Sequence, residues 1–348
     1  MKRKIKKSIT LKDIAQETGY SVNTVSRALR GKDDIAEETI ERIKDVAAKL
    51  GYVNNTIASS LRLGYTNTLA VILGDISNPH FAIMTKEIEN YARGKGYVAF
   101  LLNTNEEKDV EREAIKIAIH KNVDGIIICP TQIDDENMEL LKMSRIPFIQ
   151  IGRKGEDREL SYVVCDDVRG GYLATKYLLD NGHRNILFLN GPSYISSSRE
   201  RYEGYRKALE EGGIPFREDL VREVSLKEDD VKMVMEEIFL KNMPFTAIFA
   251  FSDSVAWNAW NWLDEHGYRV PGDYSLIGFD HIQSRMAIPF PLATISSYKT
   301  QMSITAVDCI LRMIEEEAKE ETERKAPYQT VIRTKLIRGG TVRNIRKP

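Results

Sequence analysis

The sequence predicts two kinds of folding unit in one chain of 348 residues: an N-terminal all-α helix-turn-helix head, and an α/β body of two doubly wound parallel-sheet subdomains. Three observations predict this. Two short helices with apolar periodicity, separated by a Gly-containing turn, open the chain, and a third helix follows. From residue 68 onward, apolar runs typical of buried strands alternate with amphipathic helical runs. This alternating part is about 280 residues long, so two sheets are expected rather than one.

Composition excludes several classes of protein. Hydrophobic residues make up 42% and charged residues 29% of the chain, the balance of a folded domain rather than a disordered one. No apolar run reaches the roughly 18 residues that a membrane span needs. The opening MKRKIKK has no apolar segment of a secretory signal behind it. The three cysteines lie far apart without metal-ligand spacing, which indicates reduced thiols. We therefore expect a cytoplasmic protein with no metal, no cofactor and no membrane partner.

The net charge of −1 hides an asymmetry between the two ends of the chain. The first 62 residues contain 13 of the 50 Lys and Arg residues and 8 of the 51 Asp and Glu residues, so they carry +5 and the remainder carries −6. A basic head on an acidic body indicates that the head binds a polyanion and that the body has another task.

The head contains three helices with recognisable ends. Thr10 precedes the first, with Asp13 at the capping-box position, and the apolar stripe of this helix ends at Gly19. Ser21 caps the second helix, and the third runs from about Glu37 to Leu50. Short or hydrogen-bonding side chains cluster at the start of the second helix: Val22, Asn23, Thr24, Ser26 and Arg27. Recognition helices read DNA bases with their amino-terminal residues, so this cluster predicts binding to double-stranded DNA.

Two stretches, TLKDIAQETGYSVNTVSRALRG and AEETIERIKDVAAKLGYVNNTIASSLR, resemble the head of the lactose-repressor (LacI/GalR) family of bacterial transcription regulators. The resemblance implies that Val22 and Asn23 read most of the operator and that Arg27 contacts bases or backbone. It also implies a hinge helix that folds when two subunits pair on a pseudo-palindromic operator, with Leu61 wedged into the minor groove. Asn54 stands where many relatives have Pro, and Asn is a good N-cap. The expected DNA-binding set is Thr10, Ser21, Val22, Asn23, Thr24, Ser26, Arg27, Asn54, Ser60 and Leu61.

In the body, seven apolar runs predict buried parallel strands: LAVILGD, YVAFLLN, VDGIIIC, PFIQIG, RNILFLN, AIFAFS and SLIGFD. Amphipathic stretches such as FAIMTKEIENYARGKG and VEREAIKIAIHKN lie between them. No dinucleotide fingerprint, P-loop or nucleophile elbow follows any of these strands, and no histidine has the spacing of a catalyst. The sequence therefore predicts no catalytic residues and no enzyme activity.

The body also resembles the family's effector core, which has the periplasmic sugar-binding-protein fold, through ISNPHF, DGIII, DDVRGGYLATKYLLDNGHRNI, SRERYEGYRKAL and SLIGFD. The resemblance implies two subdomains joined by three crossing strands, near Val168, Ile295 and Ala326. It implies a small effector, a sugar or sugar derivative, in the cleft at the carboxyl ends of the strands. The implied effector-binding residues are Asp75, His80, Phe81, Asp166, Arg201, Ser252, Asp253 and Asp280.

These expectations divide the chain into a helix-turn-helix head (1–53), a hinge helix or linker (54–67) and an effector-binding domain (68–343). The N-subdomain is expected at about 68–167 and 296–326, and the C-subdomain at about 168–295 and 327–343. We expect a homodimeric repressor of carbohydrate-utilisation genes, with the helix from Phe81 to Ala92 on the dimer surface. Trp257 and Trp260 are expected to pack into the core or onto the partner. Two alternatives remain open: a regulator driven by a phosphocarrier protein, and a solute-binding protein without a DNA role.

Leu61 provides a test of the hinge. If it wedges into the operator, Leu61→Ala leaves the dimer intact, removes much of the DNA bend and costs about 2–4 kcal/mol of specific affinity, because the unstacked step loses its support. A circular-permutation gel shift on a selected operator measures the bend. Equal bending by the wild type and the variant would make the segment a plain linker.

Overall fold

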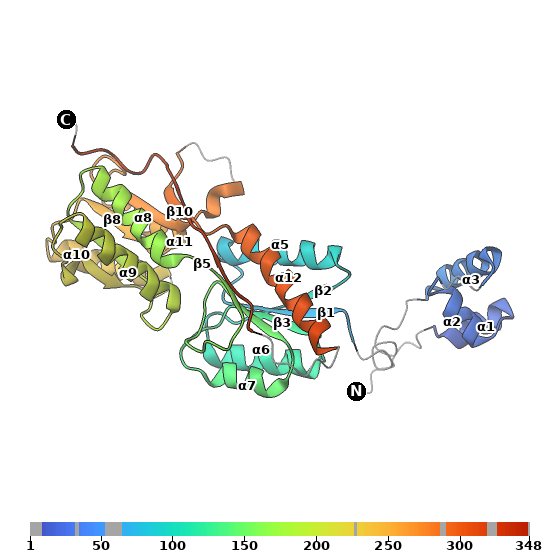
Figure 1. Ribbon diagram of the computed structural model, residues 1–348. Helices are drawn as coiled ribbons and strands as arrows, with labels where there is room; N and C mark the ends of the chain where they lie inside the picture. Colours follow the sequence, from blue (N-terminus) through green and yellow to red (C-terminus); the bar gives the residue numbers. More distant parts are fainter. Residues whose placement is uncertain are drawn as a thin grey trace, which may run out of the picture. The chain divides into compact units, whose positions relative to one another are not determined.

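The computed structural model describes residues 9–31, 35–52, 65–225, 228–285, 290–318 and 326–346. The chain divides into two compact units, Met1–Thr66 and Asn67–Pro348, which are the head and the body (Figure 1). Within the described residues, no helix is long and apolar enough to cross a membrane.

The head contains the three expected helices, α1 (Leu11–Thr18), α2 (Val22–Ala28) and α3 (Glu37–Leu50). Gly19 ends α1 in the left-handed conformation at φ 77°, where a residue without a Cβ is favoured. The inward stripes of the three helices meet in one small apolar core: Ile14, Ala15, Val25, Ala28, Ile43 and Ala47. The prediction of a helix-turn-helix followed by a third helix is confirmed.

The N-subdomain, as we use the term from here, is the half of the body built on a sheet of six parallel strands in the order β11-β5-β4-β3-β1-β2. The strands are β1 (Thr68–Leu73), β2 (Val98–Asn103), β3 (Gly125–Ile128), β4 (Phe148–Ile151), β5 (Tyr162–Cys165) and β11 (Gln329–Ile332). Helices α5 (Pro79–Gly94) and α12 (Lys299–Glu317) cover one face, and α6 (Lys108–His120) and α7 (Glu136–Ser144) cover the other (Figure 1). The central strands β1, β3 and β4 are almost entirely buried because helices cover both faces of the sheet. The edge strand β2, predicted to be buried, is exposed at Val98 and only partly buried elsewhere, because no strand lies on its outer side.

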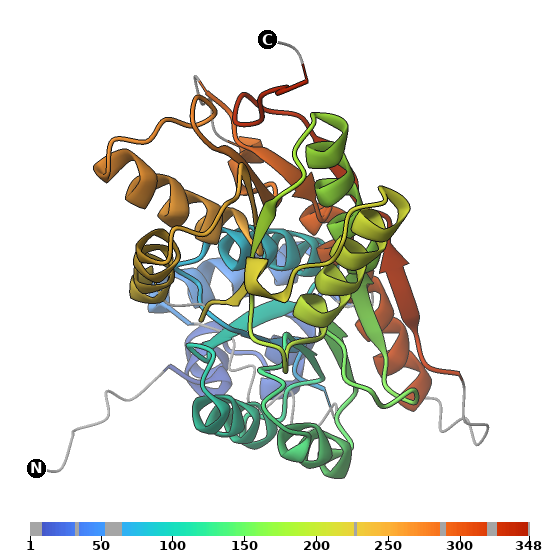
Figure 2. The same ribbon diagram turned by 90° about the vertical axis from the view of Figure 1, so that its left-hand side faces the viewer.

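The C-subdomain is built on the second sheet, in the order β12-β10-β9-β8-β6-β7, in which only β12 is antiparallel. Its strands are β6 (Ile186–Asn190), β7 (Val221–Glu223), β8 (Ala247–Ala250), β9 (Ser275–Asp280), β10 (Ala293–Ser296) and β12 (Lys335–Ile337). Helices α8 (Asp167–Asp180) and α9 (Ser196–Glu211) pack on one face, and α10 (Glu228–Leu240) and α11 (Asp253–Glu265) on the other (Figures 1 and 2). Two short 3-10 turns, η1 (Glu218–Leu220) and η2 (Ile282–Arg285), complete the described elements.

The chain passes between the subdomains three times, and one of the predicted crossing points needs correction. The first crossing lies at Asp166, between β5 and α8, within two residues of the expected Val168. The second follows β10, near Ile295 as expected. The third was expected near Ala326, but β11 pairs with β5 in the N-subdomain sheet, so the chain crosses only between Ile332 and Lys335. The expected C-subdomain segment therefore starts several residues too early.

Two glycines bring α8 and α9 into backbone contact. A Cβ atom at Gly171 would lie 2.2 Å from the carbonyl oxygen of Arg201, and one at Gly204 would lie 2.1 Å from that of Val168. No side chain fits at either distance, so the two helices can cross this closely only where both residues are glycine.

Gly171→Ala is expected to destabilise the C-subdomain by about 1–3 kcal/mol, because the added methyl group forces the two backbones apart. Gly94→Ala is the matched control: Gly94 is also helical, nothing lies within 4 Å of its added Cβ, and no loss is expected. Urea unfolding followed by far-UV circular dichroism measures both, since helices of both subdomains contribute to the signal. Equal stability of the two variants would contradict the close contact.

Candidate DNA-reading surface and effector cleft

The amino-terminal end of α2 presents an exposed polar surface on a firmly capped helix. The Ser21 hydroxyl accepts from the Thr24 amide at 3.1 Å and lies 2.8 Å from the Thr24 hydroxyl. These bonds fix the first turn and leave Val22, 41% exposed, and Asn23 facing outward. Arg27 is exposed one turn further along. An exposed Asn and Arg on a rigid helix start can form bidentate bonds with base edges.

Two other predicted head residues, Thr10 and Ser26, make hydrogen bonds with residues three or four positions along the chain. The Thr10 amide and hydroxyl both donate to the Asp13 carboxylate at 2.7 Å, which is the expected capping interaction. The Ser26 hydroxyl accepts from the Arg30 guanidinium. These bonds do not test the DNA contacts predicted for Thr10 and Ser26. Three predicted residues lie outside the described part of the chain: Asn54, Ser60 and Leu61.

In the body, Arg201 is the centre of a buried polar cluster at the carboxyl ends of the C-subdomain strands. It is 5% exposed, and its Nε donates to Asp167 Oδ1 at 2.8 Å while Nη1 donates to the Phe251 carbonyl. Its Nη2 lies 3.8 Å from Asp280 Oδ1. The guanidinium carbon lies 3.6 Å from the ring centroid of Phe279, which adds a cation–π contact. Burial raises the pKa of Asp167 to about 6, against the opposing effect of Arg201.

Asp280 links this cluster to the N-subdomain. It ends β9 with a positive φ of 99°, and its carboxylate lies 3.4 Å from Nδ1 of His80, at the start of α5. Burial lowers the pKa of His80 to about 4, so the imidazole is neutral at neutral pH. Lys299 donates its ammonium group to the Asp280 carbonyl. His80, Arg201 and Asp280 were all implied by the family resemblance, and the structure brings them together, while their contact with an effector stays a prediction.

The remaining predicted cleft residues have clear structural partners. Asp75 accepts from the Ser77 amide and hydroxyl in a local turn. Asp166 caps α8 and Ser252 caps α11, each accepting from a backbone amide. Phe81 packs in the apolar core of the N-subdomain. Their predicted contact with an effector stays a prediction.

Asp253 was interpreted as a ligand contact or a helix cap, and the structure shows a different role. It is fully buried, and its two oxygens accept from the Thr294 hydroxyl at 2.6 Å and the Ile282 amide at 2.8 Å. Burial raises its pKa to about 8. It therefore ties α11 to β10 and to η2, while the cap of α11 is Ser252.

Besides Asp167, sequence reasoning missed the buried Arg153 and its partly buried partner Glu106. Arg153, directly beyond β4, forms a bidentate pair with Glu106 at 2.7 and 2.9 Å and also donates to the Pro130 carbonyl. Their location after predicted strands could have indicated that they lie near each other, because the carboxyl ends of parallel strands in one sheet lie at the same edge. Nothing in the spacing specified that these two would pair.

Several buried polar atoms at the same strand ends have no hydrogen-bond partner within the described residues. They are Asn190 Oδ1 at the end of β6, Ser198 Oγ in the first turn of α9, His281 Nδ1 beyond β9 and Ser297 Oγ beyond β10. Buried polar groups are normally satisfied, so such a concentration indicates a place where a ligand or water supplies the missing bonds.

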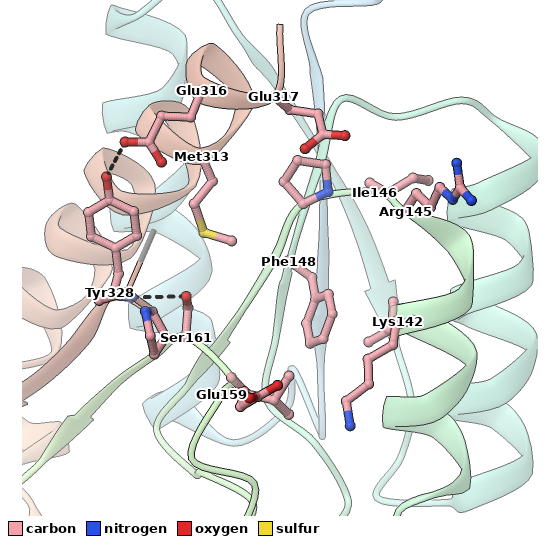
Figure 3. Close-up of a pocket in the computed structure, with 15 residues that line it drawn as sticks. Lys142, Arg145, Ile146, Phe148, Glu159, Ser161, Met313, Glu316, Glu317 and Tyr328 are labelled. Atoms are coloured by element: carbon pink, nitrogen blue, oxygen red, sulfur yellow. Dashed lines mark hydrogen bonds between the residues drawn. The ribbon is translucent and has the colours of Figure 1, made fainter. Parts of the chain in front are cut away.

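A separate hollow of about 380 Å³ lies at the opposite, amino end of β4, β5 and β11 (Figure 3). Its polar groups are largely paired within the protein: the Tyr328 hydroxyl donates to Glu316, Ser161 accepts from the Tyr328 amide, and Lys142 contacts Glu139 and Asp157. The unsatisfied polar atoms therefore favour the carboxyl-end cleft over this hollow.

A helix-turn-helix head joined to a two-sheet ligand-binding body defines a class of ligand-responsive DNA-binding regulators. Residues 10–55 match the family model described as bacterial regulatory proteins, lacI family. Residues 66–338 match the model for periplasmic binding proteins and the sugar binding domain of the LacI family. The chain belongs to the LacI family and is a DNA-binding transcriptional repressor with a ligand-binding domain. This family consists of regulators rather than enzymes, and the alternative of a solute-binding protein without a DNA role is wrong.

Individual relatives match over nearly the full length. The HTH-type transcriptional repressor PurR of Actinobacillus pleuropneumoniae serotype 3 is 31% identical over 97% of this chain and 99% of its own. The solved complex of the transcriptional regulator CelR with cellobiose is 26% identical, with a TM-score of 0.71 over 96% of this chain and 99% of that one. The lac repressor dimer bound to operator and the anti-inducer ONPF has the same fold, with a TM-score of 0.83 at 22% identity over 97% and 100% of the two chains.

Asn23→Ala is expected to weaken specific operator binding by about 1–3 kcal/mol and to leave binding to a scrambled duplex nearly unchanged, because the exposed amide reads a base edge. Fluorescence anisotropy with both duplexes at one salt concentration measures the difference. Equal loss on both duplexes would mean that Asn23 only contacts the DNA backbone.

Proposed function

We propose that this protein represses carbohydrate-utilisation genes and that a sugar or sugar derivative, bound between its subdomains, controls its affinity for the operator. The observation that carries the proposal is the set of unsatisfied buried polar atoms around Arg201 and Asp280. Asn190 Oδ1 can accept from a ligand hydroxyl, and Ser198 Oγ can both donate and accept.

The charges of the cleft favour an uncharged, hydroxyl-rich ligand. Arg201 is paired with Asp167, and Arg153 with Glu106, so each buried guanidinium already faces a carboxylate. A strongly charged ligand would have to displace one of these partners, whereas a hydroxyl can bind beside them. Two related solved structures support this class of ligand. CelR was solved as a complex with cellobiose, and a LacI family transcriptional regulator from Enterococcus faecium was solved with bound ribose. The Enterococcus faecium protein is 27% identical to this chain, with a TM-score of 0.68 over 80% of this chain and 99% of that one.

The contacts between the subdomains provide a route from ligand to DNA. His80 lies on the N-subdomain and Asp280 on the C-subdomain, 3.4 Å apart. A ligand that binds between these residues changes the relative stability of open and closed arrangements, and only such differential binding can shift the equilibrium. Along the chain, the N-subdomain begins at β1, directly after the unit that contains the head. A movement of the N-subdomain is therefore more directly linked to the head than a movement of the C-subdomain.

We also propose that the protein acts as a homodimer in the cytoplasm, where its operator lies. The edge strand β2 is apolar in five of its six positions, yet Val98 is exposed and the others are only partly buried. On the C-subdomain, Trp257 and Trp260 stack at 5.0 Å and remain half-buried, with the exposed Phe290 beside Trp260. Apolar surfaces of this kind are typical of subunit interfaces.

Ser198→Ala is the sharpest test of the cleft. The Ser198 hydroxyl has no described partner, so its removal is expected to leave stability unchanged or slightly higher while weakening effector binding by about 0.5–1.5 kcal/mol, a factor of about 2–10. Arg201→Ala is a poorer probe, because it leaves Asp167 buried without its partner.

The matched control is Thr85→Val, since the Thr85 hydroxyl on α5 is also buried and has no partner in the part of the chain that the structure describes, but it does not lie at the strand ends. The measurement is a thermal-shift screen of the wild type against neutral sugars, followed by calorimetry of both variants with the sugar that binds. An effector whose affinity is equal in wild type and Ser198→Ala would place the ligand elsewhere.

A further inference from the structure

A second hollow, of about 260 Å³, lies beside the cleft and has walls from both subdomains. The N-subdomain contributes Glu111 from α6, Gln150 from β4 and Met138 from α7, and the C-subdomain contributes Tyr194 and Arg199. The volume is several times the roughly 30 Å³ share of one water and is near the lower end, about 300 Å³, of small-molecule sites. Its lining shares no residue with the cluster around Arg201 and Asp280.

Gln150 carries an unused donor in this hollow. The side chain is fully buried, and its Oε1 accepts from the Gly155 amide at 2.8 Å. This bond fixes the orientation of the amide, so Nε2 is the free end, and it has no partner within the described residues. An unpaired buried donor is costly, so a ligand that offers an acceptor oxygen at this point gains an interaction that the protein cannot make alone.

The acidic groups of the hollow restrict the ligand further. Glu111 is buried and already accepts from the Thr131 amide at 2.7 Å and from Asn137 Nδ2 at 2.8 Å. Asp134 is paired with Lys108. Arg199, the one cationic side chain in the lining, lies 3.6 Å from Glu156. A lining with more carboxylates than cations repels anions, and the paired state of Glu111 and Asp134 gives a cation little to gain.

Contacts between the subdomains complete the hollow. Gln132 Oε1 accepts from the Ser196 amide at 2.9 Å, and the Lys154 amide donates to the Ser196 hydroxyl at 3.2 Å. The Lys154 ammonium group is also paired with Glu200 at 2.9 Å. These contacts hold Tyr194 and Arg199 against the N-subdomain wall, so a ligand here touches both subdomains only while they are closed.

We propose that this hollow is a second small-molecule site, which binds a small uncharged polyol through an oxygen that accepts from Gln150 Nε2. Binding there favours the closed arrangement, because the opposite wall belongs to the other subdomain. The lining shares no residue with the cluster around Arg201 and Asp280, so mutations can address the two sites separately.

The experiment is calorimetry of the full-length protein with D-ribose, D-xylose, D-glucose and glycerol, with inorganic phosphate and choline as charged probes. Gln150→Met keeps the length of the side chain and removes the donor. We expect at least one polyol to bind the wild type and Ser198→Ala alike, and to lose roughly tenfold or more in affinity in Gln150→Met. Phosphate and choline are expected to give no heat.

Tyr194→Ala is the second variant, chosen because Tyr194 is 45% exposed and its removal does not disturb the core. It is expected to lower the affinity for the same polyol, because it removes a contact on the C-subdomain side of the hollow. If Gln150→Met does not fold, this variant alone tests the proposed site. The proposal is overturned if no polyol binds, if only choline or phosphate binds, or if folded Gln150→Met or Tyr194→Ala binds as the wild type does. If Ser198→Ala is the only variant that loses affinity for the polyol, all of the binding belongs to the effector cleft and the proposed second site is overturned.

Discussion

The close packing of α8 against α9 is the constraint on which the cleft depends. Because Gly171 and Gly204 carry no side chains, the backbones of the two helices touch, and Arg201 lies at the point of contact. From there its guanidinium reaches Asp167 at the start of α8 and the Phe251 carbonyl beyond β8. Any wider crossing would draw Arg201 away from Asp167 and leave two buried charges unpaired, which is strongly unfavourable. The geometry of the polar cluster around Arg201 is thus set by backbone contact rather than by the polar residues themselves.

The cleft combines two kinds of polar group with different physical roles. Two ion pairs, the buried pair of Arg201 with Asp167 and the pair of the buried Arg153 with the partly buried Glu106, fix the walls and leave little net charge. Atoms without a hydrogen-bond partner among the described residues, such as Asn190 Oδ1 and Ser198 Oγ, leave hydrogen-bonding capacity unused. The first kind gives a rigid frame, and the second gives a reason for a ligand to bind, because a buried polar atom without a partner destabilises the protein until something satisfies it.

The head and the body use their polar side chains in opposite ways. In the head, a small apolar core supports α2 while Val22, Asn23 and Arg27 face outward, as a surface that reads an external polymer requires. In the body, the polar residues of interest are buried at the meeting of two sheets, as a site for a small ligand requires. Full-length similarity to the PurR repressor of Actinobacillus pleuropneumoniae covers both units together.

The sequence by itself determined the helices of the head and seven strands of the body, because apolar periodicity and helix caps are local properties of the chain. Arg201, Asp280 and His80 came from the resemblance to the LacI/GalR family, and their contact with an effector stays a prediction. The sequence did not identify β11, whose residues have little apolar pattern and form a strand only because β5 offers an edge. It also could not pair Arg153 with Glu106, or show that Asp253 is used internally by Thr294 and Ile282. Those partners are 47, 41 and 29 residues apart in the chain, and only the meeting of strand ends in the folded sheets brings them within hydrogen-bonding distance.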